Sequence, residues 1–312
     1  MDKFTKVEIE KENTKILREI GIKKPLARVE DILEFLELHR RFYNIVDQNL
    51  LQRFWYKVEV QKFKLFKLMR KVKLVAMWFP NESEIYIDST LPDPKQKWAT
   101  HHEIEHRILP WHRSFYLGDT VQTLDPNYQQ MLEAEANFGA SYLMFCGDLF
   151  KKEALDTKAE WDSILLLSKR YENSLVTTLR RYVNTTHDIP MAAFVSTPNW
   201  LEKLDDQKNR CRIFDRSDKF KEQFGNVHPG TLLSKIDENT TRRRGGPIGD
   251  FSLSLEDVNG NHHEFRAESF FNSHYVLTLI VHKIKLEFFN NIIAFPCRSD
   301  KLIHSSNIRK SP

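Results

Sequence analysis

Cysteine is scarce in this chain. Its 312 residues include three cysteines, and these lie far apart: Cys146, Cys211 and Cys297. An odd and dispersed set does not build the disulfide framework of a small secreted domain, so a reducing compartment is expected. Long apolar runs are also missing, which excludes a membrane-spanning helix, and the first residues lack the layout of a signal peptide. The sequence thus predicts a cytoplasmic protein with no membrane partner.

A strong net charge is missing too. The formal net charge is +4, and the composition is 41% hydrophobic and 29% charged, as in soluble globular proteins. Residues 1–75 hold 18 Lys and Arg against 11 Asp and Glu. Basic and aromatic side chains alternate within 57–73: Lys57, Lys62, Phe63, Lys64, Phe66, Lys67, Arg70, Lys71 and Lys73. Such a stripe can meet nucleic acid or an acidic partner, but the solvated side of an amphipathic helix has the same composition, and we favour that interpretation.

One heptapeptide has the pattern of a metal site: Thr100-His101-His102-Glu103-Ile104-Glu105-His106. On a helix, residues i and i+4 share a face with Cβ atoms about 5–6 Å apart, so His102 and His106 can reach one zinc ion. Glu103 projects about 100° around the helix, off the metal yet close enough to take a proton from bound water. His-Glu-x-x-His is the motif of zinc hydrolases, although a surface histidine pair gives the same pattern by chance.

A zinc hydrolase needs a third protein ligand and an open position for water. Asp125 and Pro126 are a good N-cap and first residue for a helix that we predict to run to about Met144. Glu133 and Asn137 share one face of that helix. We expect Glu133 to be the third ligand, and Asn137 to hold a zinc-bound imidazole by its second nitrogen.

Two other residues stay open as the third ligand. His112 has the spacing of the longer metzincin motif, which wants a Gly where this chain has Leu109. Pro110 biases Leu109 toward an extended conformation, so the helix can break there, but the left-handed turn that Gly allows is not supplied. Glu135 is the other substitute. We rank Glu133 first, although an exposed glutamate on a solvated helix face is its ordinary role.

Four blocks follow one another in a fixed order: Ile85-Tyr86-Ile87-Asp88-Ser89-Thr90-Leu91-Pro92, Lys95-Gln96-Lys97-Trp98, His102-Glu103-Ile104-Glu105-His106 and Glu133-Ala134-Glu135-Ala136-Asn137. In this order and spacing the blocks resemble the ImmA/IrrE family of metallopeptidase-like proteins. In that family a short strand leads through a proline and a basic pair into the motif helix. The resemblance covers about residues 10–195. It departs from the family at Glu105, where Gly is common, and at Cys146, where Pro usually ends the ligand helix; both changes concern packing and cleft shape.

The resemblance implies a zinc endopeptidase that cuts one specific protein, typically a transcriptional repressor, in a stress or mobile-element response. It also implies a mostly helical, zincin-like metallopeptidase domain with a small β-hairpin or sheet. In this reading Zn²⁺ is held by His102, His106 and Glu133, and Glu103 is the general base. The alternative is a non-catalytic regulator that uses the zinc fold as a scaffold and binds protein or nucleic acid through its basic surface.

The N-terminal part is predicted to contain three helices and a hairpin before the motif helix. The expected elements are helices at 11–20, 26–39 and 47–69 and strands at 73–79 and 84–88. Gly21 is expected to stop the first helix. The hairpin leads straight into the motif helix.

Two further helices are expected at 157–169 and 174–183, with Ser174 as the second N-cap. Their layout resembles a helix-turn-helix, with Arg180 and Arg181 where a recognition helix exposes its side chains. We favour a helix pair whose apolar side completes the peptidase-like fold.

A domain boundary is expected near residues 196–199. It separates residues 1–196, the metallopeptidase-like domain, from residues 200–298, a smaller α+β domain that senses a signal or binds a partner, and from a disordered tail at 299–312. Strands are expected at 212–214, 251–255, 262–267 and 275–281, with a hairpin turn at 259–260 and a mobile basic loop at 240–247. The whole chain is therefore predicted to be α+β.

Overall fold

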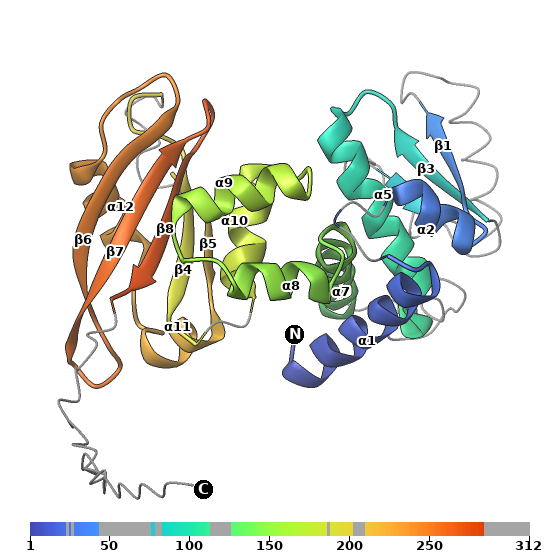
Figure 1. The fold of residues 1–312 in the computed structure, drawn as a ribbon, viewed down its shortest axis with the longest axis horizontal. Coiled ribbons are helices and arrows are strands. Elements are labelled where there is room, and N and C mark those ends of the chain that lie inside the picture. Colours follow the sequence, from blue (N-terminus) through green and yellow to red (C-terminus); the bar gives the residue numbers. More distant parts are fainter. Residues whose placement is uncertain are drawn as a thin grey trace, which may run out of the picture.

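The computed structural model of the chain describes residues 1–22, 25, 28–43, 76–78, 83–112, 126–185, 188–201 and 210–283. The expected helix at 47–69, the basic stripe at 57–73 and the tail at 299–312 lie outside these residues. Figure 1 shows two β-sheets with helices between and around them, so the chain is α+β, as predicted. Among the helices of the described residues, none is long and apolar enough to cross a membrane.

Helix α1 (Lys3–Glu19) is bounded by caps that its own sequence supplies. The Asp2 side chain accepts a hydrogen bond from the backbone nitrogen of Thr5 at 3.0 Å. At the other end Gly21 has a φ of +79°, and the nitrogen of Ile22 donates to the carbonyl of Leu17 at 3.0 Å. Gly adopts this left-handed turn without steric cost, so the predicted stop is confirmed.

The small sheet has the strand order β1 (His39–Tyr43), β3 (Glu84–Asp88) and β2 (Ala76–Trp78). β2 and β3 pair antiparallel, as the predicted hairpin requires, and β1 lies parallel to β3. The helix expected to end near residue 39 is shorter: α2 (Val29–Phe35) stops before Glu37, whose φ is +54°. The chain then enters β1, because its pairing with β3, far along the sequence, overrides the local helical periodicity.

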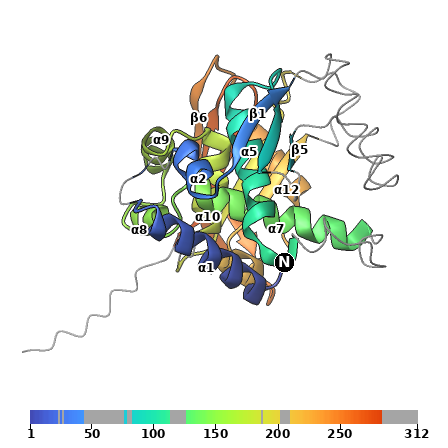
Figure 2. The same ribbon diagram turned by 90° about the vertical axis from the view of Figure 1, so that its right-hand side faces the viewer.

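Helix α5 (Asp93–Ile108) carries the motif and packs between the small sheet and α7 (Pro126–Met144). It ends at Leu109, which is extended with a ψ of 113°, as Pro110 predicts. The limits of α7 match the predicted helix. α1 also packs on α7, and Figure 2 shows these helices gathered below β1 and α2.

Helices α8 (Asp148–Leu155), α9 (Trp161–Arg170) and α10 (Leu175–Asn184) lie between the two sheets (Figure 1). Ser174 caps α10 by accepting from the nitrogen of Thr177 at 3.1 Å, as predicted. Arg180 pairs with Asp215, and Arg181 is buried over the ring of Tyr142. Because Arg181 is buried and Arg180 is held in an ion pair with β5, the structure favours a packed helix pair over a DNA-reading one.

The large sheet has the order β5-β4-β8-β7-β6, and all neighbouring strands are antiparallel. Its strands are β4 (Met191–Ser196), β5 (Cys211–Arg216), β6 (Gly246–Glu256), β7 (His262–Phe271) and β8 (Val276–His282). Each strand expected after residue 200 is present, and Gly260 in the turn between β6 and β7 has a φ of +85°.

Both faces of the large sheet are covered. α11 (Asp218–Gln223) and α12 (Pro229–Asn239) cover one face, and α9 and α10 cover the other. β4 precedes the expected boundary at 196–199, yet it lies inside this sheet between β5 and β8. The large sheet and the helix pair therefore share one core across that point of the sequence. β6 also begins inside the expected basic loop at 240–247.

Candidate metal centre

Helices α5 and α7 bring three candidate ligands together. His102 and His106 lie one turn apart on α5, and their Nε2 atoms are 3.1 Å from each other. Glu133 on α7 places its carboxylate oxygens 3.1 Å from Nε2 of His102 and 3.7 Å from Nε2 of His106. One ligand atom from each residue lies within 4.8 Å of the other two. The residues that the sequence ranks first therefore meet at one point.

The spacing of these atoms suits one small cation. Zinc holds nitrogen and oxygen ligands at about 2.0–2.1 Å in a tetrahedron, which separates two ligand atoms by about 3.3–3.4 Å. The two Nε2 atoms are 3.1 Å apart, and each faces one oxygen of Glu133, Oε2 at 3.1 Å from His102 and Oε1 at 3.7 Å from His106, so these distances lie around that value. The side chain of Glu133 is 45% exposed and that of His106 is 3% exposed, so the centre faces solvent on the side of Glu133.

Asn137 contacts the other nitrogen of His102. Its Oδ1 lies 3.1 Å from Nδ1 of His102. When Nδ1–H donates to the amide oxygen, Nε2 faces the carboxylate of Glu133, where it can bind a cation or, when protonated, donate to that carboxylate. An outer contact of this kind holds the ring of a metal-binding histidine in place. The contact expected for Asn137 from the sequence is present.

The two substitute ligands, His112 and Glu135, lie behind His106. Nδ1 of His112 is 2.9 Å from Nδ1 of His106, on the edge of the His106 ring that faces away from Nε2. Glu135 Oε2 lies 3.0 Å from Nε2 of His112 and accepts a hydrogen bond from Nε1 of Trp111 at 2.7 Å. Both substitutes are buried. Neither reaches the point where the other three ligand atoms meet.

Burial and charge set the protonation of the two imidazoles. Burial, aided by His102 and His112, holds the pKa of His106 well below its usual range. Burial also lowers the pKa of His102, but the hydrogen bond to Glu133 and the charges of Glu103 and Glu133 outweigh it, so the pKa is raised. The centre thus favours a positive charge between His102 and Glu133, which a proton or a metal ion can supply.

Glu103, the candidate base, is buried next to the ligands. Its charge raises the pKa of His102, so the two side chains lie close. Burial and the charges of Asp88 and Glu103 raise the pKa of Tyr43. Tyr43 and Asp88 are the last residues of β1 and β3. Glu103 is therefore near both the ligands and one end of the small sheet.

Glu105 stands where the resembled family has Gly, and Gly139 of α7 makes room for it. The side chain of Glu105 is fully buried, and a Cβ at residue 139 would lie 2.0 Å from its Oε2. Nδ2 of Asn13 in α1 donates to the same oxygen at 3.2 Å. Burial raises the pKa of Glu105 to about 8, so the carboxyl is mostly protonated at neutral pH. The replacement of the family's Gly by Glu105 therefore affects the packing of α5 on α7.

Asn13, Trp111 and Tyr43 also contact residues of this region, and their roles were not predicted from the sequence. Asn13 carries a usable signal, because it interrupts the apolar stripe that Ile9 and Ile16 form on α1, and a buried polar side chain needs a partner. The sequence around Trp111 and Tyr43 contains no such signal, because the carboxylates near these two side chains come from other elements.

Comparison with known proteins adds information about the fold. No protein-family model matches the chain, and no curated protein matches it. Among solved structures, a Mycobacterium tuberculosis transcriptional regulator is similar, with a TM-score of 0.50 and 10% sequence identity over 88% of this chain and 76% of that chain. At this identity the likeness concerns the arrangement of helices and strands.

Proposed function

We propose that this chain is a zinc-dependent endopeptidase of the ImmA/IrrE type, with a zincin-like metallopeptidase region, that cleaves a specific protein. The observation that carries the proposal is the meeting of His102, His106 and Glu133 beside Glu103. Three nitrogen and oxygen ligands, a side open to solvent and an adjacent carboxylate are the groups that a zinc hydrolase requires.

The residues divide the chemistry between them. His102, His106 and Glu133 would hold the ion, which would lower the pKa of a water molecule and polarise the peptide carbonyl. Glu103 would act as the general base and accept the proton of the attacking water on its carboxylate. Glu103 then passes the proton to the leaving amine, so the carboxylate is restored at the end of the cycle.

The resemblance favours a repressor-like transcription factor as the substrate, cut in a stress or mobile-element response. The large sheet, with helices on both faces, would then sense the signal or hold the partner. The neighbouring solved structure is named as a transcriptional regulator, which is compatible with a role in transcription but concerns that protein.

A Glu103→Gln variant tests the proposal. Gln keeps the size of the side chain but cannot take the proton, so zinc content should stay at the wild-type level and cleavage should fall by roughly 100-fold or more. Cleavage is measured by mass spectrometry as new N-termini in a peptide library made from a whole proteome. Glu19→Gln, at an exposed position of α1, is the matched control and should cleave normally. The proposal would be contradicted if the zinc-loaded wild-type protein produced no cleavage beyond that seen with Glu103→Gln.

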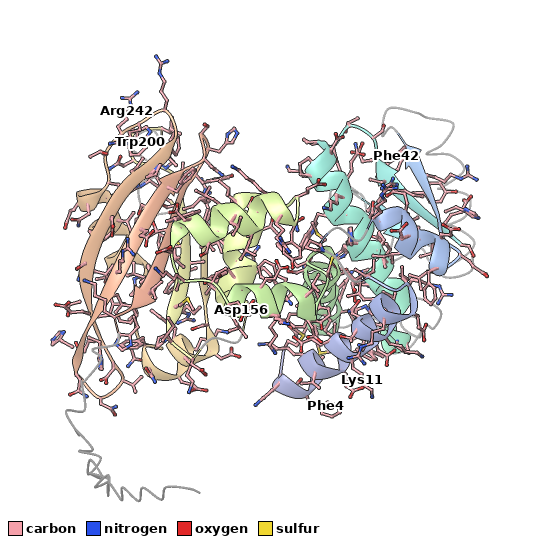
Figure 3. All side chains as sticks on the ribbon, viewed as in Figure 1. Phe4, Lys11, Phe42, Asp156, Trp200 and Arg242 are labelled. Carbon is pink, nitrogen blue, oxygen red and sulfur yellow. The ribbon has the colours of Figure 1, made fainter. Side chains whose placement is uncertain are left out.

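A non-catalytic regulator is the second candidate. It is favoured by Arg242, Arg243 and Arg244, three exposed cations before β6, at the same end of the large sheet as Trp200 (Figure 3). Such a loop can meet the phosphates of nucleic acid or an acidic protein. If Glu103→Gln keeps full activity in cells and replacement of the three arginines by Ser abolishes it, this candidate replaces the endopeptidase.

A further inference from the structure

A chain of three buried contacts begins at the nitrogen of His106 that faces away from the metal centre. Nδ1 of His106 meets Nδ1 of His112 at 2.9 Å, and Nε2 of His112 meets Oε2 of Glu135 at 3.0 Å. Nε1 of Trp111 donates to the same oxygen at 2.7 Å. The side chains of His112 and Glu135 are 0% and 4% exposed. Water therefore has little access to these contacts.

The donors and acceptors of these three contacts fit together in one way once His106 binds a cation through Nε2. Its Nδ1 must then carry the hydrogen and donate to Nδ1 of His112. His112 must consequently carry its own hydrogen on Nε2, where Glu135 accepts it. Glu135 is the last acceptor in this series of hydrogen bonds, because an ionised carboxylate accepts hydrogen bonds and donates none.

The opposite direction would disable the ligand. If Nδ1 of His112 donated to His106, the hydrogen of a neutral His106 would have to sit on Nε2, pointing at the candidate metal position. A protonated Nε2 cannot bind a metal. The buried carboxylate of Glu135 prevents this arrangement, because it needs a donor from Nε2 of His112.

We propose that His112 and Glu135 are positioning residues that hold His106 in the tautomer whose Nε2 lone pair points at the candidate metal position between His102 and Glu133. This inference rests on the proposed metal centre and deepens it. Trp111 fixes the carboxylate of Glu135 through its second hydrogen bond. His102 has a different support, the exposed amide of Asn137, so the two ligands of one motif are held by unlike neighbours.

Two substitutions of His112 separate positioning from mere packing. His112→Leu fills much of the space but removes the acceptor for Nδ1 of His106. His112→Asn restores an acceptor near the position of Nδ1, with an amide group that can donate toward Glu135. Competition with a chelator measures the zinc affinity of the full chain. We expect roughly 10- to 100-fold weaker binding for Leu and a recovery to within about threefold of wild type for Asn.

The result that overturns the inference is equal zinc affinity in wild type and a folded His112→Leu variant, with folding checked by circular dichroism. Equal losses for Leu and Asn also overturn it, because the acceptor would then be irrelevant. His262→Leu, at an exposed position in β7, controls for the chemical change itself and should bind zinc as wild type does.

A second measurement decides the inference even without metal binding. Nitrogen NMR of the metal-free chain with labelled histidines reports which ring nitrogen carries hydrogen. We expect hydrogen on Nδ1 of His106 and on Nε2 of His112, and the reverse pattern overturns the inference. If the wild-type protein shows the expected tautomers but binds no zinc, the proposed function is wrong, and the inferred role of His112 and Glu135 in fixing the tautomer of His106 is still supported.

Discussion

His102, His106 and Glu133 direct two ring nitrogens and a carboxylate at the same small volume. Acceptors this close repel each other unless a positive charge lies among them, and Nε2 of His102 is 3.1 Å from both of its neighbours. The raised pKa of His102 expresses the same demand, because burial alone would lower it. At the residue scale, the three side chains therefore favour one positive charge among them, which a proton or a metal ion can supply.

The sequence predicted the inner residues of this centre well because a helix fixes them locally. A spacing of four places His102 and His106 on one face whatever else the chain does, and the same spacing relates Glu133 to Asn137. The roles of His112 and Glu135 could not be predicted, because they depend on how a turn after α5 meets α7.

A separate histidine gives the large sheet a pH dependence. Burial and the neighbouring His263 lower the pKa of His282 from its usual 6.5. The rings of Phe224 and Phe265 lie against it. Because the folded state binds the proton less tightly, the contribution to stability is full above pH 6.5 and is lost as the pH falls through the folded-state pKa.

We therefore expect the free energy of unfolding in urea to be lower at pH 5.5 than at pH 7.5, and His282→Phe to reduce that difference. His262→Phe, on the exposed side of β7, is the control and should leave it unchanged. An identical pH dependence in wild type and His282→Phe would refute this assignment.

At the scale of elements, the packing of α5 on α7 depends on the large side chain of Glu105 and on Gly139, which has no side chain. Glu105 occupies the space above Gly139, and α1 closes it with Asn13. Because the side chain of Glu105 is fully buried, it has no free volume into which to swing.

Gly139→Ala should therefore destabilise the protein by about 1–3 kcal/mol, since the new methyl group overlaps the carboxyl of Glu105. Glu105→Ala combined with Gly139→Ala should recover much of this loss, and urea unfolding of the four proteins gives the coupling. Additive effects of the two changes would show that the helices do not meet at this pair.

Elements whose ends carry local signals were predicted closely, and those set by distant pairing were not. Gly21, Pro110, Pro126 and Ser174 mark ends that the structure has. Strand β1 was not predicted, because the helical period of residues 26–36 was extended to residue 39 and the partner strand β3 lies far along the chain. Nothing within residues 36–43 announces that pairing.

At the scale of the whole molecule, the large sheet is tied to the helices before it. Trp161 of α9 stacks on Phe270 of β7, with ring centroids 5.2 Å apart, and its backbone nitrogen donates to Glu268 at 3.0 Å. β4 lies between β5 and β8. The strand-rich pattern after residues 196–199 suggested a boundary there, but strand pairing crosses that point, because β4 pairs with β5 and β8.

A chain that ends at residue 197 should consequently fail to fold as an independent unit. It would leave β4 without either neighbour and expose the apolar face that α9 and α10 share with β8. We expect aggregation or a circular dichroism spectrum without a cooperative thermal transition. A chain of residues 1–283, which keeps every strand described here, is the matched control. A stable, monomeric 1–197 fragment would restore the boundary.

The most direct test of the central claim is a crystal structure of the zinc-loaded chain with diffraction data collected at the zinc absorption edge. We predict one anomalous peak about 2.0–2.2 Å from Nε2 of His102, Nε2 of His106 and a carboxylate oxygen of Glu133, with the remaining position open to water. An absent peak, or a peak bound by His112 or Glu135 in place of Glu133, would contradict the account.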